Sequence, residues 1–134
     1  MKKQSLSFFG LAITLLTAFS VNATEVAINN LKAGGLADSL TVRSIDQTKV
    51  TKLTLSGNVN GADVIVIRRM AGCNETGGET DGYALSELDM TGSNIVEGGG
   101  KYLTDDAQHE YFTENKVIGK YFFYNCKNLK KYTF

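Results

Sequence analysis

The chain has 134 residues, with 14 basic and 14 acidic side chains and a hydrophobic fraction of 43%. This length suffices for one small domain with a core of its own. A formal net charge of zero gives no electrostatic basis for binding nucleic acid or an anionic lipid surface, so we expect neither partner.

The first residues follow the order of a secretory signal. Residues 1–3 provide a basic start, residues 6–19 form an apolar run, and residues 20–23 offer small side chains suited to a cleavage site. The alternative is a membrane anchor, but the run is short for a transmembrane helix, which needs about 20 residues. We interpret residues 1–23 as a signal peptide of an exported protein. Cleavage would start the mature chain at Thr24, leaving no membrane-spanning segment.

Export bears on the two cysteines, Cys73 and Cys126, because compartments outside the cytoplasm permit disulfides. Their wide separation does not indicate a bridge by itself, and cysteine is often buried without a partner. Two free thiols are therefore the favoured interpretation, and a disulfide is the alternative. The spacing does not match a C-x-x-C metal site.

The start of the mature chain predicts a strand followed by a short helix. Val26 and Ile28 alternate with polar residues over residues 24–31, which favours a strand. Two glycines then break the pattern, and residues 36–40 suit a short amphipathic helix. We interpret residues 24–49 as an N-terminal cap, since the first repeat of a solenoid otherwise exposes its apolar end.

Three later segments share the spacing apolar-x-x-apolar-x-apolar, which places apolar side chains on the inner face of short solenoid strands. They are Val50, Leu53 and Leu55; Leu85, Leu88 and Met90; and Leu129, Tyr132 and Phe134. The triplets begin 35 and 44 residues apart, and the extra length over an ordinary repeat falls in glycine-rich loops. The predicted fold class is α/β: a short leucine-rich-repeat-like solenoid of parallel strands over residues 50–134, with a truncated array as one interpretation.

The segments between the triplets predict one helix and two loops. Residues 63–71 contain a β-branched run that suits a strand, but Asp63 at the start and Gly72 at the end favour a helix. Residues 73–82 are polar and glycine-rich, which indicates an exposed loop. Residues 98–116 read as a second loop, whose aromatic side chains we expect to tether it to the core.

Three motifs carry a resemblance to a known family. They are Ile118-Gly119-x-x-Phe122-Phe123-x-x-Cys126-x-x-Leu129-x-x-Tyr132-x-Phe134; Leu53-Thr54-Leu55-Ser56-Gly57 with Asn60-Gly61-Ala62-Asp63 and Arg69-Met70-Ala71-Gly72; and Leu85-Ser86-Glu87-Leu88-Asp89-Met90. Together they resemble the N-terminal part of BspA-like leucine-rich repeat surface proteins, over roughly residues 26–134. The resemblance implies a secreted or surface-attached bacterial protein with a role in adhesion.

The chain departs from this family in two respects. Phe122 stands where the family has a small residue, and a larger side chain strains a packed repeat unless its neighbour is small. The family also continues with many repeats, whereas this sequence holds one good copy of the final motif. We therefore expect the start of a repeat array.

The sequence predicts a binding module in preference to an enzyme. His109 is the only histidine and has no nucleophile in a recognisable setting, so we name no catalytic residue. No metal-binding or phosphate-binding spacing is present, and we expect no cofactor. The expected function is adhesion or recognition of a protein or glycan ligand. The alternative is a capping fragment of a longer repeat protein, with a structural role alone.

If the triplets align as adjacent parallel strands, their outward residues form rows that a ligand can contact. The candidate interaction surface is Lys52, Thr54, Glu87, Asp89, Lys131 and Thr133. The last strand leaves an exposed edge, and such edges template association. The candidate residues for self-association there are Phe122, Tyr124, Tyr132 and Phe134. The alternative is that residues 101–116 cover this edge.

Overall fold

The computed structural model describes residues 23–134, so the predicted signal peptide lies outside the described residues except for Ala23. In chain order the elements are β1 (Thr24–Leu31), α2 (Leu36–Val42), β2 (Val50–Val59), α3 (Gly61–Met70), β3 (Glu87–Ile95), β4 (Lys101–Thr104), β5 (Glu110–Phe112) and β6 (Lys131–Thr133). The predicted first strand, the short helix after it and the helix near residues 63–71 are all confirmed.

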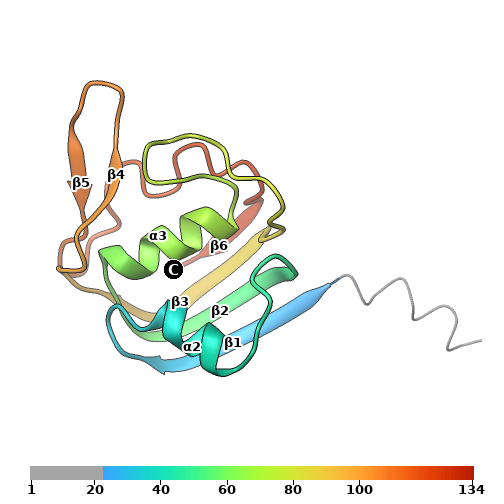
Figure 1. The fold of residues 1–134 in the computed structure, drawn as a ribbon. Helices are drawn as coiled ribbons and strands as arrows, with labels where there is room; N and C mark the ends of the chain where they lie inside the picture. Colours follow the sequence, from blue (N-terminus) through green and yellow to red (C-terminus); the bar gives the residue numbers. More distant parts are fainter. Residues whose placement is uncertain (1–22) are drawn as a thin grey trace, which may run out of the picture.

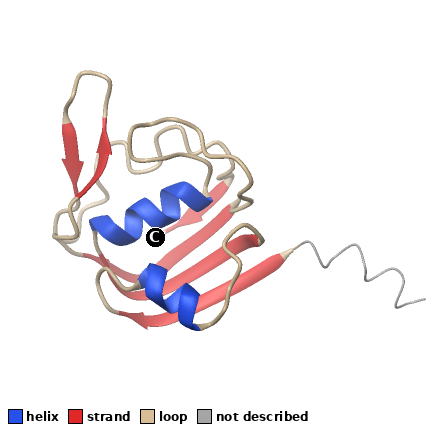
Figure 2. Ribbon diagram, in the orientation of Figure 1, coloured by secondary structure: helices blue, strands red, loops and turns tan. Residues whose placement is uncertain are grey.

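Four strands form one parallel sheet in the order β1-β2-β3-β6. Both helices lie on the same face of this sheet (Figures 1 and 2). The predicted α/β class with parallel strands is therefore confirmed. Parallel strands need long crossover connections. Helix α2 lies in the first, helix α3 in the second, and the third, from β3 to β6, contains β4 and β5.

The register of the sheet confirms that the three apolar triplets align. Leu53 pairs with Leu88, and Leu88 pairs with Tyr132. Leu53 and Leu88 are fully buried beneath the helices, together with Val50 and Leu85 from the start of the same triplets. The first two triplets thus place their apolar residues in one continuous core, because side chains alternate between the two faces of a strand, whereas Tyr132 and Phe134 of the third triplet are exposed.

Helix α3 begins at a capping box that also fixes the start of α2. The Asn60 side chain accepts a hydrogen bond from the Ala62 N–H, and the Asp63 carboxylate accepts one from the Asn60 N–H. The same carboxylate accepts the N–H groups of Gly34 and Leu36, at 2.7 and 2.9 Å. Asp63 therefore joins the N-termini of both helices.

Helix α3 is buried on nearly all sides, which explains its β-branched sequence. Val64, Val66 and Ile67 are all buried. The sheet covers one side of the helix, and the loops after α3 and after β5 cover the opposite side (Figure 1). A helix enclosed in this way needs apolar residues around its circumference, not along one stripe.

Residues 101–116, predicted as a loop, contain an antiparallel hairpin formed by β4 and β5. The hairpin forms because Tyr102 and Leu103 are buried against the rest of the fold, while Lys101 and Glu110 form an ion pair of 2.7 Å. Tyr102 also donates a hydrogen bond to the Lys120 carbonyl, at 2.7 Å. The expected tethering role is confirmed for Tyr102, and the hairpin stands out on the helix side of the molecule (Figure 1).

The prediction of two free thiols was wrong, because Cys73 and Cys126 form a disulfide. The two segments approach closely at Gly72, whose φ of +101° favours glycine. A Cβ at that position would lie 2.9 Å from the Lys127 side chain. The Asn128 N–H donates to the Ala71 carbonyl at 2.9 Å, which aligns the segments next to the bridge.

Candidate binding surfaces

The face of the sheet opposite the helices carries a row of charges that alternate in sign. Glu25, Lys52, Glu87 and Lys131 occupy paired positions on β1, β2, β3 and β6. The predicted row of Lys52, Glu87 and Lys131 is therefore confirmed, and β1 adds Glu25, which we did not predict. We name these four residues the charge row.

Glu87 and Lys131 form an ion pair within the charge row. A hydrogen bond from Lys131 lowers the pKa of Glu87, and the same bond raises the pKa of Lys131. Their Nζ and Oε2 atoms lie 2.9 Å apart. Opposite charges on neighbouring strands attract, although solvent screens exposed pairs.

A second row on the same face is mainly uncharged. Ala27 pairs with Thr54, Thr54 with Asp89, and Asp89 with Thr133. Hydrogen bonds from the backbone and side chain of Thr91 lower the pKa of Asp89. Parallel sheets are usually covered on both faces. Here the two rows form a polar face that neither helix covers, and we name it the open face.

The free edge of β6 carries exposed aromatic side chains. Tyr132 shares the helix side of the sheet with Leu88, yet its exposed fraction is 56%, and that of Phe134 is 46%. Phe123 packs against both, with ring centroids 5.0 Å from Tyr132 and 5.9 Å from Phe134. We name Phe123, Tyr132 and Phe134 the edge aromatic cluster.

Two residues predicted for this edge lie elsewhere. Phe122 is buried, because its ring packs edge-on against Tyr102 with centroids 5.1 Å apart. Tyr124 is exposed but its ring lies beside Tyr121, over the loop that contains Gly77. Among the described strands β6 pairs with β3 alone, so the hairpin of residues 101–116 does not extend the sheet at this edge.

Arg68 holds together the loops that cover α3. Its side chain is fully buried, and its two terminal nitrogens donate hydrogen bonds of 2.9–3.2 Å to four backbone carbonyls. These carbonyls belong to Asn74, Tyr121, Phe122 and Tyr124. Burial lowers the pKa of the guanidinium, which nevertheless remains charged at neutral pH. In the sequence, Arg68 is recognisable only as a basic residue near the end of a helix, and that position does not reveal this role.

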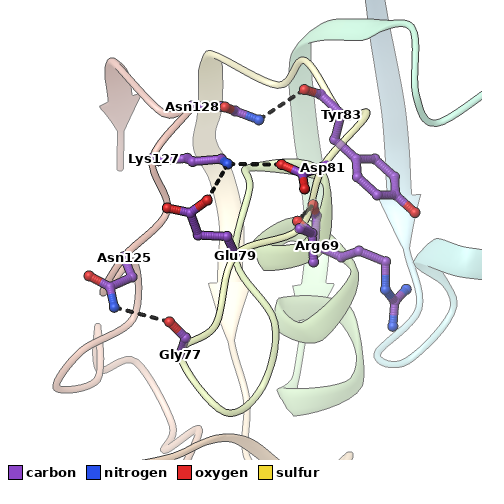
Figure 3. Close-up of polar contacts among 9 residues, drawn as sticks. Arg69, Gly77, Glu79, Asp81, Tyr83, Asn125, Lys127 and Asn128 are labelled. Carbon is purple, nitrogen blue, oxygen red and sulfur yellow. Dashed lines mark hydrogen bonds and ion pairs between the residues drawn. The ribbon is translucent and has the colours of Figure 1, made fainter.

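A second set of contacts joins the loop after α3 to the segment before β6 (Figure 3). Lys127 forms ion pairs with Glu79 at 2.7 Å and Asp81 at 3.1 Å. Asn125 donates a hydrogen bond to the Gly77 carbonyl, and Asn128 donates one to the Tyr83 carbonyl. Figure 3 shows these contacts spaced along the two segments, so the loops are joined at several points.

The joined loops and the hairpin enclose a cleft of about 460 Å³. Tyr121 and Tyr124 line one side with partly exposed rings, and Asp105 and Asp106 line the hairpin side. Tyr121 and Asn125 both adopt left-handed backbone conformations with φ of 60°. Such conformations persist where surrounding contacts enforce them. Sequence reasoning did not identify this cleft, because its walls come from three segments far apart in the chain.

Asp105 organises the tip of the hairpin. Its carboxylate accepts hydrogen bonds from the N–H groups of Ala107 and His109 and from the Tyr111 hydroxyl, all at 2.9 Å. The bond from the His109 backbone is the largest of several effects that lower its pKa to about 2. Burial, followed by the bond to Asp105, raises the pKa of Tyr111 to about 12.

Compared with known proteins, the sequence matches no family model and no curated relative. Within residues 23–134, no helix is long and apolar enough to cross a membrane. Among these same residues, no group of three or more His, Cys, Asp or Glu side chains is placed to hold a metal ion. The geometry of the surfaces is therefore the main guide to function.

Proposed function

We propose that the chain is an exported recognition module of the leucine-rich-repeat type, which binds a protein or glycan ligand through the open face. The single observation that carries the proposal is that face. A parallel sheet is rarely left uncovered, and this one carries charged and hydroxyl side chains in two aligned rows. Such groups can hydrogen-bond to a polar ligand without rearrangement of the backbone.

The repeat character of the module rests on the aligned triplets. Leu53, Leu88 and Tyr132 stand in one row on the helix side, as equivalent positions of stacked repeats would. Residues 24–49 supply the edge strand β1 and helix α2, which suits a cap over the first repeat. The resemblance to BspA-like surface proteins supports adhesion as the biological role and export as the route.

A structural role as a capping fragment of a longer array is the second candidate. It is favoured by the free edge of β6, where an additional parallel strand could pair. In that case the open face would continue into further repeats, and this chain would contribute stability to the array but no ligand contacts of its own.

The open face can be tested by capture experiments with the purified protein, using host-matrix proteins and a glycan array as probes. Thr54→Arg and Asp89→Arg place bulky side chains at the centre of the face, where Thr54 and Asp89 are paired positions. The control is Glu114→Arg, at an exposed position outside both rows. We expect the two face variants to lose at least tenfold in affinity while the control binds as the wild type does.

Two outcomes would count against the proposal. One is a ligand that binds all three variants equally, which would move the contact to another surface such as the cleft. The other is an absence of binding to every probe by folded wild-type protein, which would favour the structural role. Circular dichroism of each variant establishes that it is folded.

A further inference from the structure

Among the described strands, β1 and β6 form the two edges of the sheet, and they end the charge row with opposite signs. β1 starts the row with Glu25, and β6 ends it with Lys131. Within the chain, Lys52 already lies between two acids, because its paired positions are Glu25 and Glu87. Lys131 has an acid on one side only. An acidic residue on an added strand would place Lys131 between two acids, as Lys52 is.

We propose that copies of this chain associate head to tail, with β1 of one copy added as a parallel strand beside β6 of the next. In the register that continues the charge row, Glu25 of the second copy lies beside Lys131. On the helix side, Val26 of that copy lies beside Tyr132, just as Val26 lies beside Leu53 within one chain. The association therefore reuses a pairing that the fold already contains.

The helix sides of the two edges also have complementary shapes. The edge aromatic cluster projects from β6, with Tyr132 and Phe134 about half exposed. At the other edge lies a groove of about 360 Å³ between β1 and α2, lined by Ile28, Asn29, Asp38, Ser39, Val42 and Arg43. Val42 is 83% exposed in this groove. Seating aromatic rings there would remove apolar surface from water on both copies.

One contact opposes the association. The Arg43 guanidinium donates a hydrogen bond of 2.6 Å to the Ala27 carbonyl on the edge strand β1. Charged side chains at strand edges commonly limit pairing with other chains. Arg43 must therefore move when a strand is added, and once displaced it can stack on an aromatic ring of the cluster. We expect association mainly at high protein concentration.

The contact is heterologous, since each copy uses two different surfaces. Repeating it generates open chains of copies unless the rotation between them closes a ring. The average mass should then rise continuously with concentration. An isologous contact, in which two β6 edges meet, would stop at a dimer. The proposal does not depend on the ligand of the open face, and its test uses no ligand.

Sedimentation velocity of residues 24–134, the mature chain after the predicted cleavage, tests the proposal when it is measured over a concentration series at low salt. The variants are Glu25→Lys and Lys131→Glu, each of which sets like charges against one another at the contact between copies. We expect each variant alone to associate about tenfold more weakly than the wild type, because like charges in contact repel. High salt should reduce the difference.

An equimolar mixture of the two variants provides the decisive measurement. Position 25 of one variant and position 131 of the other again carry opposite charges, so the mixture should recover the association that each variant lacks. An isologous contact between two β6 edges is distinguished by Glu25→Lys alone, which would leave that association unchanged because Glu25 lies on β1. A wild-type chain that stays monomeric across the series, or folded variants whose mixture associates no better than either alone, would overturn the proposal.

Discussion

Glu87 on β3 and Lys131 on β6 occupy paired positions of adjacent parallel strands, and their charged atoms lie 2.9 Å apart. Lys52 on β2 faces Glu87 from the other side. A single carboxylate thus separates two cations on the open face. Reversing the charge of Glu87 therefore tests whether the strands have this register.

Glu87→Lys should lower stability, because it sets three cations side by side across β2, β3 and β6. We expect a lower denaturation midpoint in about 10 mM salt, and a smaller difference in about 1 M salt, where the Debye length falls to about 3 Å. Glu114→Lys makes the same change of charge at an exposed position outside the row and is the control. Equal midpoints for the two variants at low salt would contradict the observed register.

The disulfide should account for much of the stability of the loops over α3. Cys73 and Cys126 are 53 residues apart, and closing a loop of that length stabilises a protein by about 2–4 kcal/mol in typical cases. We expect a reducing agent to lower the thermal midpoint of the wild type. The Cys73→Ser/Cys126→Ser variant should start at that lower midpoint and not respond to the reductant. A wild type unaffected by complete reduction would contradict this expectation.

Removing the Arg68 side chain should be more damaging than removing its neighbour. Arg68→Ala leaves four backbone carbonyl acceptors, one of them buried and three partly buried, without their donor, and hydrogen bonds to charged groups contribute about 1.5–3 kcal/mol each. We expect a loss of at least about 3 kcal/mol, measured by urea unfolding. Arg69→Ala is the matched control, because Arg69 is only partly buried. Similar losses for both variants would show that the Arg68 contacts are not important for stability.

The sheet was largely predictable from the sequence, because strand periodicity is a local signal. The spacing of Leu53 and Leu55 recurs around Leu88, and the structure pairs these strands in the expected row. Helix α3 was predictable despite its β-branched run, since Asp63 lies in its first turn and Gly72 follows its last. The outward row from Lys52 to Lys131 then follows from alternation along each strand.

The remaining features depend on contacts between distant segments. The hairpin forms because Tyr102 and Leu103 are buried by parts of the fold that a local pattern of polar residues does not reveal. The disulfide requires the close approach at Gly72. Arg68 binds backbone carbonyls, and a carbonyl acceptor has no signature in the sequence. The cleft combines three such segments, so sequence reasoning could not have located it.

The hairpin should contribute a pH-dependent part of the stability through Asp105. Its pKa is about 2 in the folded protein, below the value of about 3.9 expected in the unfolded chain. A lowered pKa means that the contribution is fully present above about pH 4 and is lost as the pH falls through about 2. Asp105→Asn should therefore flatten the decline in stability between pH 4 and pH 2, measured by urea unfolding at each pH.

Stability at alkaline pH gives a second measure of the hydrogen bond between Tyr111 and Asp105. Tyr111 has a pKa of about 12, above its ordinary value of 10.0, so its contribution is present below about pH 10 and is lost as the pH rises through about 12. Tyr111→Phe should remove this loss and also raise the pKa of Asp105, which then lacks the hydroxyl donor at 2.9 Å. Asp106→Asn changes the neighbouring exposed carboxyl and is the control for both limbs. If Asp106→Asn flattened the acid limb as much as Asp105→Asn, the dependence would reflect general charge repulsion and not the hydrogen bonds that Asp105 accepts.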